Sequence, residues 1–370
     1  MSNSKPYYIG LMSGTSMDGI DAALVEFDQE TLRVIAYHEE ELPSHLLKQL
    51  HRLCLPGENE INMLGKCHRQ LGQLFAQATL NLLKHAHVDS KQVQAIGSHG
   101  QTIRHMPHGN LGFSLQVGDP HTIASETGID VIADFRGKDI ALGGEGAPLV
   151  PAFHQALFAQ KNKIRLLINI GGIANITYLN GTKEVIGFDS GPGNTLLDAW
   201  SREVHNKAFD EQGAFAAQGQ PCTALLDHMC QHTFFKQDIP KSTGRELFNT
   251  AWLKQQLSHF QHLSDQDVQA TLLAFTSRTI AEAVLKITPK GDVFICGGGA
   301  LNPVLMNTLQ QDLPHFQVQP TDALGLPAQQ VEAVAFAWLA KQFKEKNPTS
   351  LPQVTGSRRE AILGAYYPAD

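Results

Sequence analysis

Three glycine-rich turns contain the residue types that bind phosphate and nucleotides. The first consists of Gly14, Thr15, Ser16, Met17, Asp18, Gly19, Ile20 and Asp21. Its small residues would let backbone N–H groups approach a phosphate, and its two hydroxyls add donors. Either Asp18 or Asp21 could hold a hydrated Mg²⁺. The same composition is typical of an ordinary hairpin turn, so both interpretations stay open for this turn alone.

The second turn runs from Gly187 to Asn194, between a predicted strand at 185–188 and a predicted helix. A helix N-terminus carries about half a positive charge and free N–H groups, which suits an anion beside Gly191, Gly193 and Asn194. Asp189 falls at the carboxyl end of the strand, where α/β proteins place ligands and catalytic groups. The alternative is that Asp189 only caps the loop.

The third turn is Gly297, Gly298 and Gly299, followed by Ala300, Leu301 and Asn302. Three glycines between a strand and a helix leave room for a flat ring to lie against the backbone. Tight packing between the strand and the helix would explain the same glycines.

Several common enzyme sites are absent from the 370 residues. No GxxxxGK[ST], GxGxxG, GxSxG or HExxH pattern occurs, which argues against P-loop nucleotidases, common Rossmann dehydrogenases, standard α/β-hydrolases and zincins. The net charge of −7 and the lack of a basic run argue against nucleic-acid binding. No apolar run is long enough for a membrane span, and the polar N-terminus is no signal peptide. Five cysteines without CxxC spacing indicate a reduced, cytoplasmic protein without structural zinc.

The elements that position the turns repeat along the chain. Strands at 7–12 and 20–27 flank the first turn, and strands at 164–170 and 173–179 flank Gly171 and Gly172, close to half the chain length later. Two hairpin-initiated halves with alternating strands and helices predict a duplicated α/β fold. The repeat places the domain boundary near residue 160, giving domains 1–160 and 161–370.

Together, two phosphate-type turns and a glycine shelf on a duplicated chain resemble the actin/hexokinase/Hsp70 superfamily, which binds ATP between two duplicated domains. More closely, the sequence resembles the anhydro-N-acetylmuramic acid kinases. The motifs that carry this resemblance are Ile9–Gly19, Ser98–Thr102, Ala133–Arg136, Asn169–Asn175, Phe188–Asn194, Lys241–Glu246 and Leu351–Gly356.

The resemblance implies a two-domain, ribonuclease H-like fold with an interdomain cleft, and an activity that uses ATP and Mg²⁺. The family opens the 1,6-anhydro bridge of anhydro-N-acetylmuramic acid and phosphorylates O6 for cell-wall recycling in the cytoplasm. By resemblance, Gly14–Asp21 binds phosphate, with Asp18 near the metal, and Asp189 is the catalytic base. Gly297–Gly299, with Asn302, forms the adenosine shelf. Arg136 and Glu332 join Asp189 in holding the sugar.

Other interpretations remain at this point. Arg136 could form a structural ion pair with Asp134 or Asp139, and Glu332 could be a solvent-facing helix residue. An anhydro-sugar hydrolase without ATP and an ATP-driven conformational switch are the rival functions. Lys138, Glu145 and Leu301 depart from the residues common in the family, and His99, His105, His108 and His121 match no known metal spacing and are interpreted as structural or surface groups. The sequence allows a homodimer but does not determine the oligomeric state.

Overall fold

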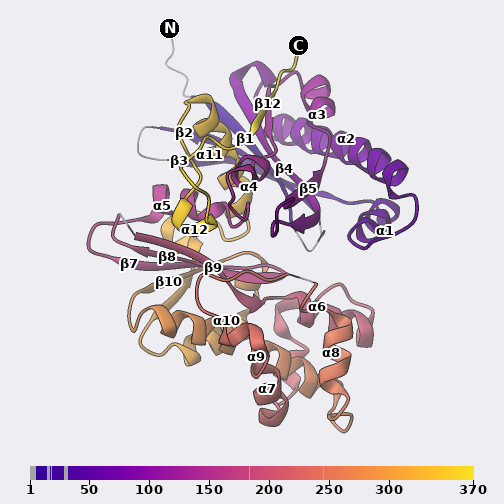
Figure 1. Cartoon of the computed structure of the whole chain (residues 1–370), viewed down its shortest axis with the longest axis vertical. Helices are drawn as coiled ribbons and strands as arrows, with labels where there is room; N and C mark the ends of the chain where they lie inside the picture. The colour runs from indigo at the N-terminus through magenta and orange to yellow at the C-terminus, as the bar shows by residue number, and fades with distance from the viewer. Residues whose placement is uncertain (1–5, 15–16, 18, 29–31, 183, 245) are drawn as a thin grey trace. The chain divides into compact units, whose positions relative to one another are not determined.

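The computed structural model describes residues 6–14, 17, 19–28, 32–182, 184–244 and 246–370 (Figure 1). The chain divides into two units, one of Met1–Phe153 with Gln330–Asp370 and one of His154–Gln329. The predicted division at residue 160 comes within a few residues of the first crossing. It differs at the second crossing, because the last 41 residues pack with the first unit rather than the second.

The first unit contains a seven-stranded sheet whose main path runs β12-β6-β4-β1-β2-β3, with β5 beside β4. Its strands are β1 (Tyr7–Ser13), β2 (Gly19–Phe27), β3 (Leu32–Glu41), β4 (Val93–Met106), β5 (Phe113–Val117), β6 (Val131–Ala133) and β12 (Ala365–Tyr367). The strands β1, β2 and β3 form an antiparallel meander, and β4 and β6 continue the sheet in parallel from β1.

The second unit repeats this arrangement in a five-stranded sheet of order β11-β10-β7-β8-β9. Its strands are β7 (Ile164–Ile170), β8 (Ile173–Asn180), β9 (Glu184–Pro192), β10 (Asp292–Cys296) and β11 (Gln317–Pro320). Again three strands form an antiparallel meander, and two parallel strands extend the sheet from the first of them. The strands β6-β4-β1-β2-β3 of the first sheet share their order and directions with β11-β10-β7-β8-β9, so the predicted duplicated α/β fold of ribonuclease H type is confirmed.

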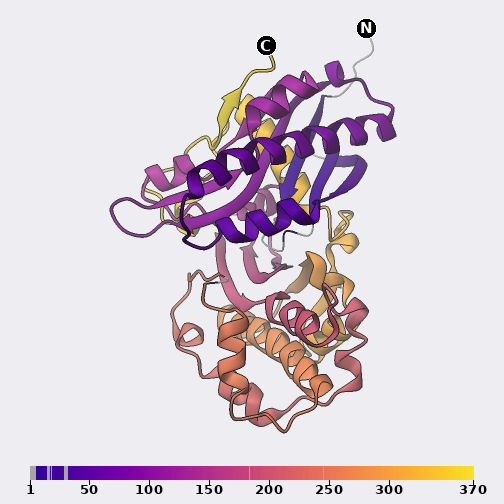
Figure 2. The same cartoon turned by 90° about the vertical axis from the view of Figure 1, so that its right-hand side faces the viewer.

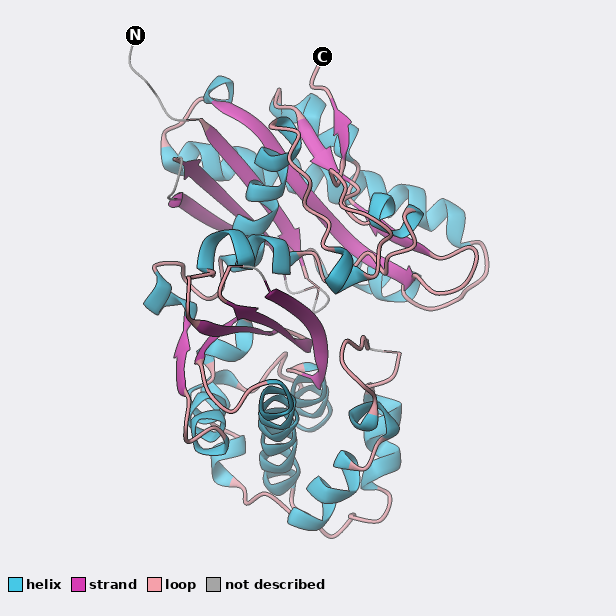
Figure 3. Cartoon of the chain, turned by 60° about the vertical axis from the view of Figure 1, so that its left-hand side comes forward, coloured by secondary structure: helices cyan, strands magenta, loops and turns pink. Residues whose placement is uncertain are grey.

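Helices cover both sheets, as the secondary-structure view shows (Figure 3). The first unit has α1 (Ser44–Leu53), α2 (Glu60–Ala86), α3 (Pro120–Thr127), α4 (Gly137–Ala141), α11 (Val331–Lys344) and α12 (Pro352–Thr355). The second has α6 (Thr195–His205), α7 (Thr223–Cys230), α8 (Thr250–Leu257), α9 (Asp265–Ile287) and α10 (Pro303–Asp312), and α5 (Val150–Phe158) spans the division. Short 3-10 helices are η1 (Ser90–Gln92), η2 (Glu211–Gly213), η3 (Ala216–Gln218), η4 (Thr233–Lys236), η5 (Gly298–Leu301) and η6 (Thr321–Leu324).

Two glycines explain why α11 belongs to the first unit. A Cβ atom on Gly10 would lie 1.7 Å from the carbonyl oxygen of Ala333, and one on Gly97 would lie 2.0 Å from that of Phe336. The helix backbone therefore packs directly against β1 and β4. Ile9 and Leu11 point to the opposite face, because side chains alternate along a strand, and they share a buried cluster with residues of α2.

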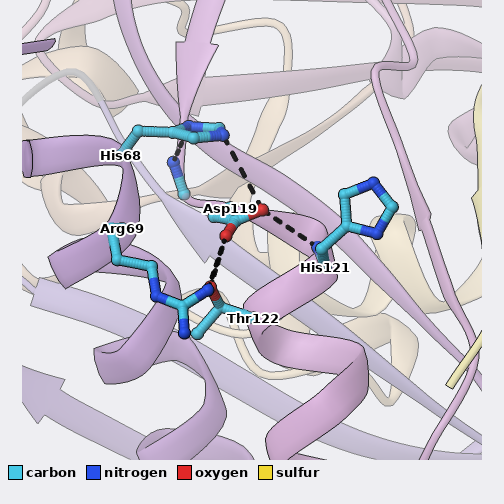
Figure 4. A network of polar contacts seen from close by, with 6 residues as sticks. His68, Arg69, Asp119, His121 and Thr122 are labelled. Atoms are coloured by element: carbon cyan, nitrogen blue, oxygen red, sulfur yellow. Dashed lines mark hydrogen bonds and ion pairs between the residues drawn. The ribbon is translucent and has the colours of Figure 1, made fainter. Parts of the chain in front are cut away.

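The long helix α2, seen along its length in Figure 2, is tied to α3 through Asp119 (Figure 4). The carboxylate of Asp119 caps α3 by accepting a hydrogen bond from the His121 amide (3.1 Å) and from the Thr122 hydroxyl. It also pairs with Arg69 of α2 (3.3 Å). His121 thus contributes its backbone amide to this helix cap, and its side chain is exposed.

In the second unit, α9 runs through the core. It begins at an N-cap, Ser264, whose side chain accepts a hydrogen bond from the Asp267 amide. Its buried residues join a cluster with the inner faces of β7, β8 and β10. Among the described residues, no helix is both long and apolar enough to cross a membrane.

Candidate active site

The first glycine turn joins β1 to β2. Within it, the amide of Met17 donates to the Gly14 carbonyl (3.1 Å), and Met17 has a positive φ of 59°. The buried hydroxyl of Ser13 lies within hydrogen-bond distance of the Gly19 carbonyl (2.9 Å) and of Gln101 Oε1 on β4 (2.7 Å). These contacts fix both ends of the turn. Thr15, Ser16 and Asp18 lie outside the described residues.

The last two residues of this turn, Ile20 and Asp21, lie in different surroundings. Ile20 is fully buried in the core, so only its backbone could face a nucleotide. The half-buried Asp21 accepts a short hydrogen bond from the Tyr37 hydroxyl. Burial, together with Asp21, raises the pKa of Tyr37, so this phenol stays protonated and keeps donating. Asp21 is therefore a carboxylate held in place at the start of β2.

Arg136, at the N-terminus of α4, is held by three hydrogen bonds. Its Nε and Nη2 donate to Nε2 of His99 on β4 (3.3 and 2.8 Å), and its Nη1 donates to the Gly146 carbonyl (2.6 Å). Burial, together with the Arg136 charge, lowers the pKa of His99 to about 3. His99 is thus a neutral acceptor. Burial also lowers the pKa of Arg136 to about 10, a value at which the guanidinium remains charged at neutral pH.

The loop that carries Gly146 depends on the buried carboxylate of Asp139. Asp139 Oδ2 accepts from the Gly146 amide (2.8 Å), and Oδ1 accepts from the Thr355 hydroxyl (2.8 Å). The carboxylate of Asp134 instead accepts from the Gly137 amide (3.1 Å). Asp134 and Asp139 therefore anchor backbone, and the hydrogen bonds of Arg136 go to His99 and Gly146.

Glu332 lies in the first turn of α11 and is half-buried. Its charge is close enough to Arg136 to oppose the lowering of the Arg136 pKa. The structure therefore brings together two predicted sugar-binding residues, Arg136 and Glu332, in the first unit.

In the second unit, Asp189 lies within β9, not at its end, because the strand continues to Pro192. The pairing with β8 shifts here: Asn175 faces Asp189, while Ala174 faces Gly191. Ser190 is therefore the extra residue of a β-bulge, and its hydroxyl donates to the Ala174 carbonyl (3.1 Å). Bulges bend a strand and redirect its side chains, which is how a mid-strand aspartate can serve a site.

The segment that follows Lys241 orients the Asp189 carboxylate. Its Oδ2 accepts hydrogen bonds from the Thr243 amide (2.9 Å) and the Ser242 hydroxyl (3.1 Å). The Asp189 amide donates to the Lys241 carbonyl (2.9 Å). Lys241 itself packs over the ring of Phe234 (4.3 Å), and burial lowers its pKa to about 8.

The backbone amides of the loop after β9 form hydrogen bonds within the protein. The amides of Gly193 and Asn194 donate to the carbonyls of Gly172 and Gly171 (2.9 and 2.8 Å). A Cβ on Gly193 would lie 2.3 Å from the Gly171 carbonyl oxygen, so glycine is required by this close approach. The sequence predicted free amides that could bind an anion here. In the structure the carbonyls of the β7–β8 turn accept hydrogen bonds from the amides of Gly193 and Asn194 instead.

The third glycine turn lies next to this loop. A Cβ on Gly297 would meet Asn169, and one on Gly299 would meet Ile170, so both glycines pack on the end of β7. Gly298 is exposed and faces the Asn194 side chain. The side chain of Asn302 caps α10 by accepting from the amides of Val304 and Leu305 (both 3.1 Å). One corner of the second unit is therefore lined by Gly297, Gly298, Gly299, Asn194 and Asn302.

Three residues that contact the candidate site had no specific role in the sequence interpretation: His99, Ser242 and Thr243. All three lie in motifs that carry the family resemblance, and that position was the available signal. His99 was grouped with structural histidines, and the structure shows that the group it supports is Arg136.

Among the described residues, no group of three or more His, Cys, Asp or Glu side chains could hold a metal ion.

Known proteins give a consistent picture. The family described as "Anhydro-N-acetylmuramic acid kinase" matches residues 6–369. Proteins named anhydro-N-acetylmuramic acid kinase from Shewanella amazonensis and Shewanella oneidensis are 58% and 57% identical to this chain, each over 99% of it and 100% of the relative. The relative of that name from Shewanella denitrificans is 57% identical, with the same coverage. The chain belongs to the anhydro-N-acetylmuramic acid kinase family.

Proposed function

We propose that this protein transfers the γ-phosphoryl group of ATP to O6 of 1,6-anhydro-N-acetylmuramic acid and opens the anhydro ring with water. The product is N-acetylmuramic acid 6-phosphate, which serves peptidoglycan recycling and amino-sugar catabolism in the cytoplasm, where ATP is available. The observation that carries the proposal is the family match over nearly the whole chain. Asp189, which lies beside the β-bulge and accepts two hydrogen bonds, supplies a carboxylate suited to the chemistry.

An anhydro sugar has no free hydroxyl at O6, so the acceptor must form during the reaction. Asp189 takes a proton from a water molecule as the water oxygen bonds to C1. The C1–O6 bond breaks, and its electron pair stays on O6. O6 then bonds to the γ-phosphorus, and ADP leaves with the electrons of the cleaved phosphoanhydride bond.

The hydrogen bonds to Oδ2 of Asp189 suit a base of this kind. Ser242 and Thr243 donate to Oδ2 and so fix the plane of the carboxylate. Hydrogen bonds of this kind favour the charged form of a carboxylate, which is the form that accepts a proton.

Arg136 and Glu332 would hold the sugar. The guanidinium is suited to the lactyl carboxylate, since an arginine and a carboxylate form strong, directional hydrogen bonds. Glu332 can accept hydrogen bonds from sugar hydroxyls.

The turn from Gly14 to Asp21 and the corner at Gly297–Gly299 would bind ATP. Gly298 is the exposed glycine of that corner and leaves its backbone open to a flat ring. Mg²⁺, when bound with the nucleotide, would neutralise charge on the phosphates.

The test combines purified protein, ATP, Mg²⁺ and 1,6-anhydro-N-acetylmuramic acid in ¹⁸O-labelled water. We expect one ATP consumed per ring opened, with the label at C1 of the 6-phosphorylated product, as read by mass spectrometry. Ring opening without nucleotide would instead identify a hydrolase. Sugar-independent release of labelled phosphate would identify an ATP-driven switch.

A further inference from the structure

His99 is a buried histidine whose ring tautomer can be assigned from its partners. It lies on β4, is 7% exposed, and packs 4.8 Å from the Phe336 ring of α11. Its Nδ1 is 2.9 Å from the Gly100 carbonyl oxygen. A carbonyl only accepts hydrogen bonds, so Nδ1 carries the ring hydrogen and Nε2 presents a lone pair.

The Nε2 lone pair of His99 accepts two hydrogen bonds from one edge of the Arg136 guanidinium. Nε and Nη2 form the lateral fork of the group, and both donate to His99 Nε2. Nη1 donates once, to Gly146. Of the five guanidinium N–H bonds, these contacts use three, and the two that remain are one on each terminal nitrogen.

A neutral acceptor has a consequence that a carboxylate in the same place would not have. An aspartate or glutamate could accept the same two hydrogen bonds, but it would also cancel the positive charge of Arg136. Burial, together with Arg136, holds the pKa of His99 at about 3, so the ring stays neutral throughout the physiological range. Glu332 and Asp139 already act on the charge of Arg136, and His99 orients the guanidinium without adding a further negative charge to theirs.

We propose that His99 is a positioning residue that aims the terminal N–H groups of Arg136 at the substrate carboxylate, and thereby sets the preference for anhydro sugars that bear a carboxylate. This inference rests on the proposed function, since it assigns the carboxylate specificity of the same sugar site. His99 acts through Arg136 and does not itself contact the sugar.

The test compares two substrates, 1,6-anhydro-N-acetylmuramic acid and 1,6-anhydro-N-acetylglucosamine, which lacks the lactyl carboxylate. His99→Phe keeps a ring against Phe336 but removes the acceptor. We expect kcat/KM for the carboxylate sugar to fall by about 10- to 100-fold, mainly through KM, because a charge-assisted contact is lost. The value for the other sugar should stay within about twofold. If that sugar is turned over too slowly, calorimetric Kd values for both sugars replace kcat/KM.

Two further variants separate positioning from a structural effect. His99→Gln retains an acceptor oxygen and should restore much of the preference. His121→Phe, an exposed histidine of the same unit, should behave as the wild type. Melting curves report whether each variant is folded, and His99→Gln with Arg136→Lys provides the test if His99→Phe does not fold.

In a double-mutant cycle, Arg136→Lys keeps the charge but loses the fork, so changing His99 should add little in that background. An unchanged substrate preference in a folded His99 variant, or additive effects in the cycle, would overturn the inference. Equal losses for both sugars would overturn it as well. A wild-type protein that phosphorylates neither sugar would refute the proposed function itself, and the role of His99 would be rejected with it.

Discussion

Arg136 and Asp189, the two charged residues proposed to act on the sugar, are held in different ways. Arg136 ends a buried chain of contacts that runs from Thr355 through Asp139 and Gly146. Asp189 is held locally, by a strand bulge and by the backbone and hydroxyl of a neighbouring segment. We therefore expect sugar binding to be sensitive to residues remote from the guanidinium, and the proposed base to be sensitive to the residues that contact its carboxylate.

The largest expected effect is at the base. Asp189→Asn preserves the shape but removes the proton acceptor, so kcat should fall by about 10²- to 10⁴-fold. Calorimetry should show unchanged ATP binding. Asp265→Asn, which changes an exposed aspartate of α9, is the matched control. Turnover of Asp189→Asn within threefold of the wild type, roughly, would show that another group takes the proton.

The second prediction concerns the pH dependence of stability that arises from His99, the hydrogen-bond acceptor of Arg136. The folded pKa of His99 is about 3, well below the unfolded value of about 6.5. The unfolded chain therefore binds the extra proton between these values. The stability that this group contributes is complete above pH 6.5 and is lost as the pH falls toward 3, at up to about 1.4 kcal/mol per pH unit.

Urea unfolding between pH 7 and pH 4.5 checks this sign. The wild type should lose more stability on acidification than His99→Gln, which cannot take up the proton. Parallel curves for the two proteins would show that His99 has a similar pKa in the folded and unfolded chains.

The third prediction concerns Thr355, the residue farthest from Arg136 in the chain of hydrogen bonds through Asp139 and Gly146. Thr355→Val removes the hydroxyl that donates to the fully buried Asp139, and an unsatisfied buried acceptor costs about 1–3 kcal/mol of unfolding free energy. Thr321→Val is the control, because the buried Thr321 hydroxyl has no hydrogen-bond partner among the described residues. Equal urea midpoints for the two variants would contradict the importance of this contact.

The smallest effect is expected at the exposed neighbour of the base. Ser242→Ala removes one of the two donors to Asp189 Oδ2 but leaves the Thr243 amide in place. We expect kcat to fall by about two- to tenfold, with little change in the melting temperature. Ser258→Ala, at another exposed serine, should leave kcat unchanged. A loss as large as that of Asp189→Asn would mean that Ser242 does more than orient the carboxylate.

Much of the fold could be predicted from periodicity alone. The apolar pattern of the sequence predicts helices at 61–85 and 331–343, and these correspond to α2 (Glu60–Ala86) and α11 (Val331–Lys344), because long apolar repeats are strong signals. The sequence also predicts a strand at 93–97, which in the structure continues to Met106. Its added residues Ser98 and Gln101 pair with Leu11 and Ser13 of β1, and polar residues in a strand give no periodic signal until their partners are known.

The duplicated hairpins, the glycine turns and the candidate carboxylates can be predicted from residue types and local spacing. The packing of α11 on the first sheet cannot, because Gly10 and Gly97 meet its backbone across a long sequence separation. The same holds for the amides of Gly193 and Asn194, which donate to the β7–β8 turn, and for the histidine that accepts hydrogen bonds from Arg136. A hydrogen-bond partner distant in sequence is chosen by the packing of whole elements, so no local pattern of residues contains it.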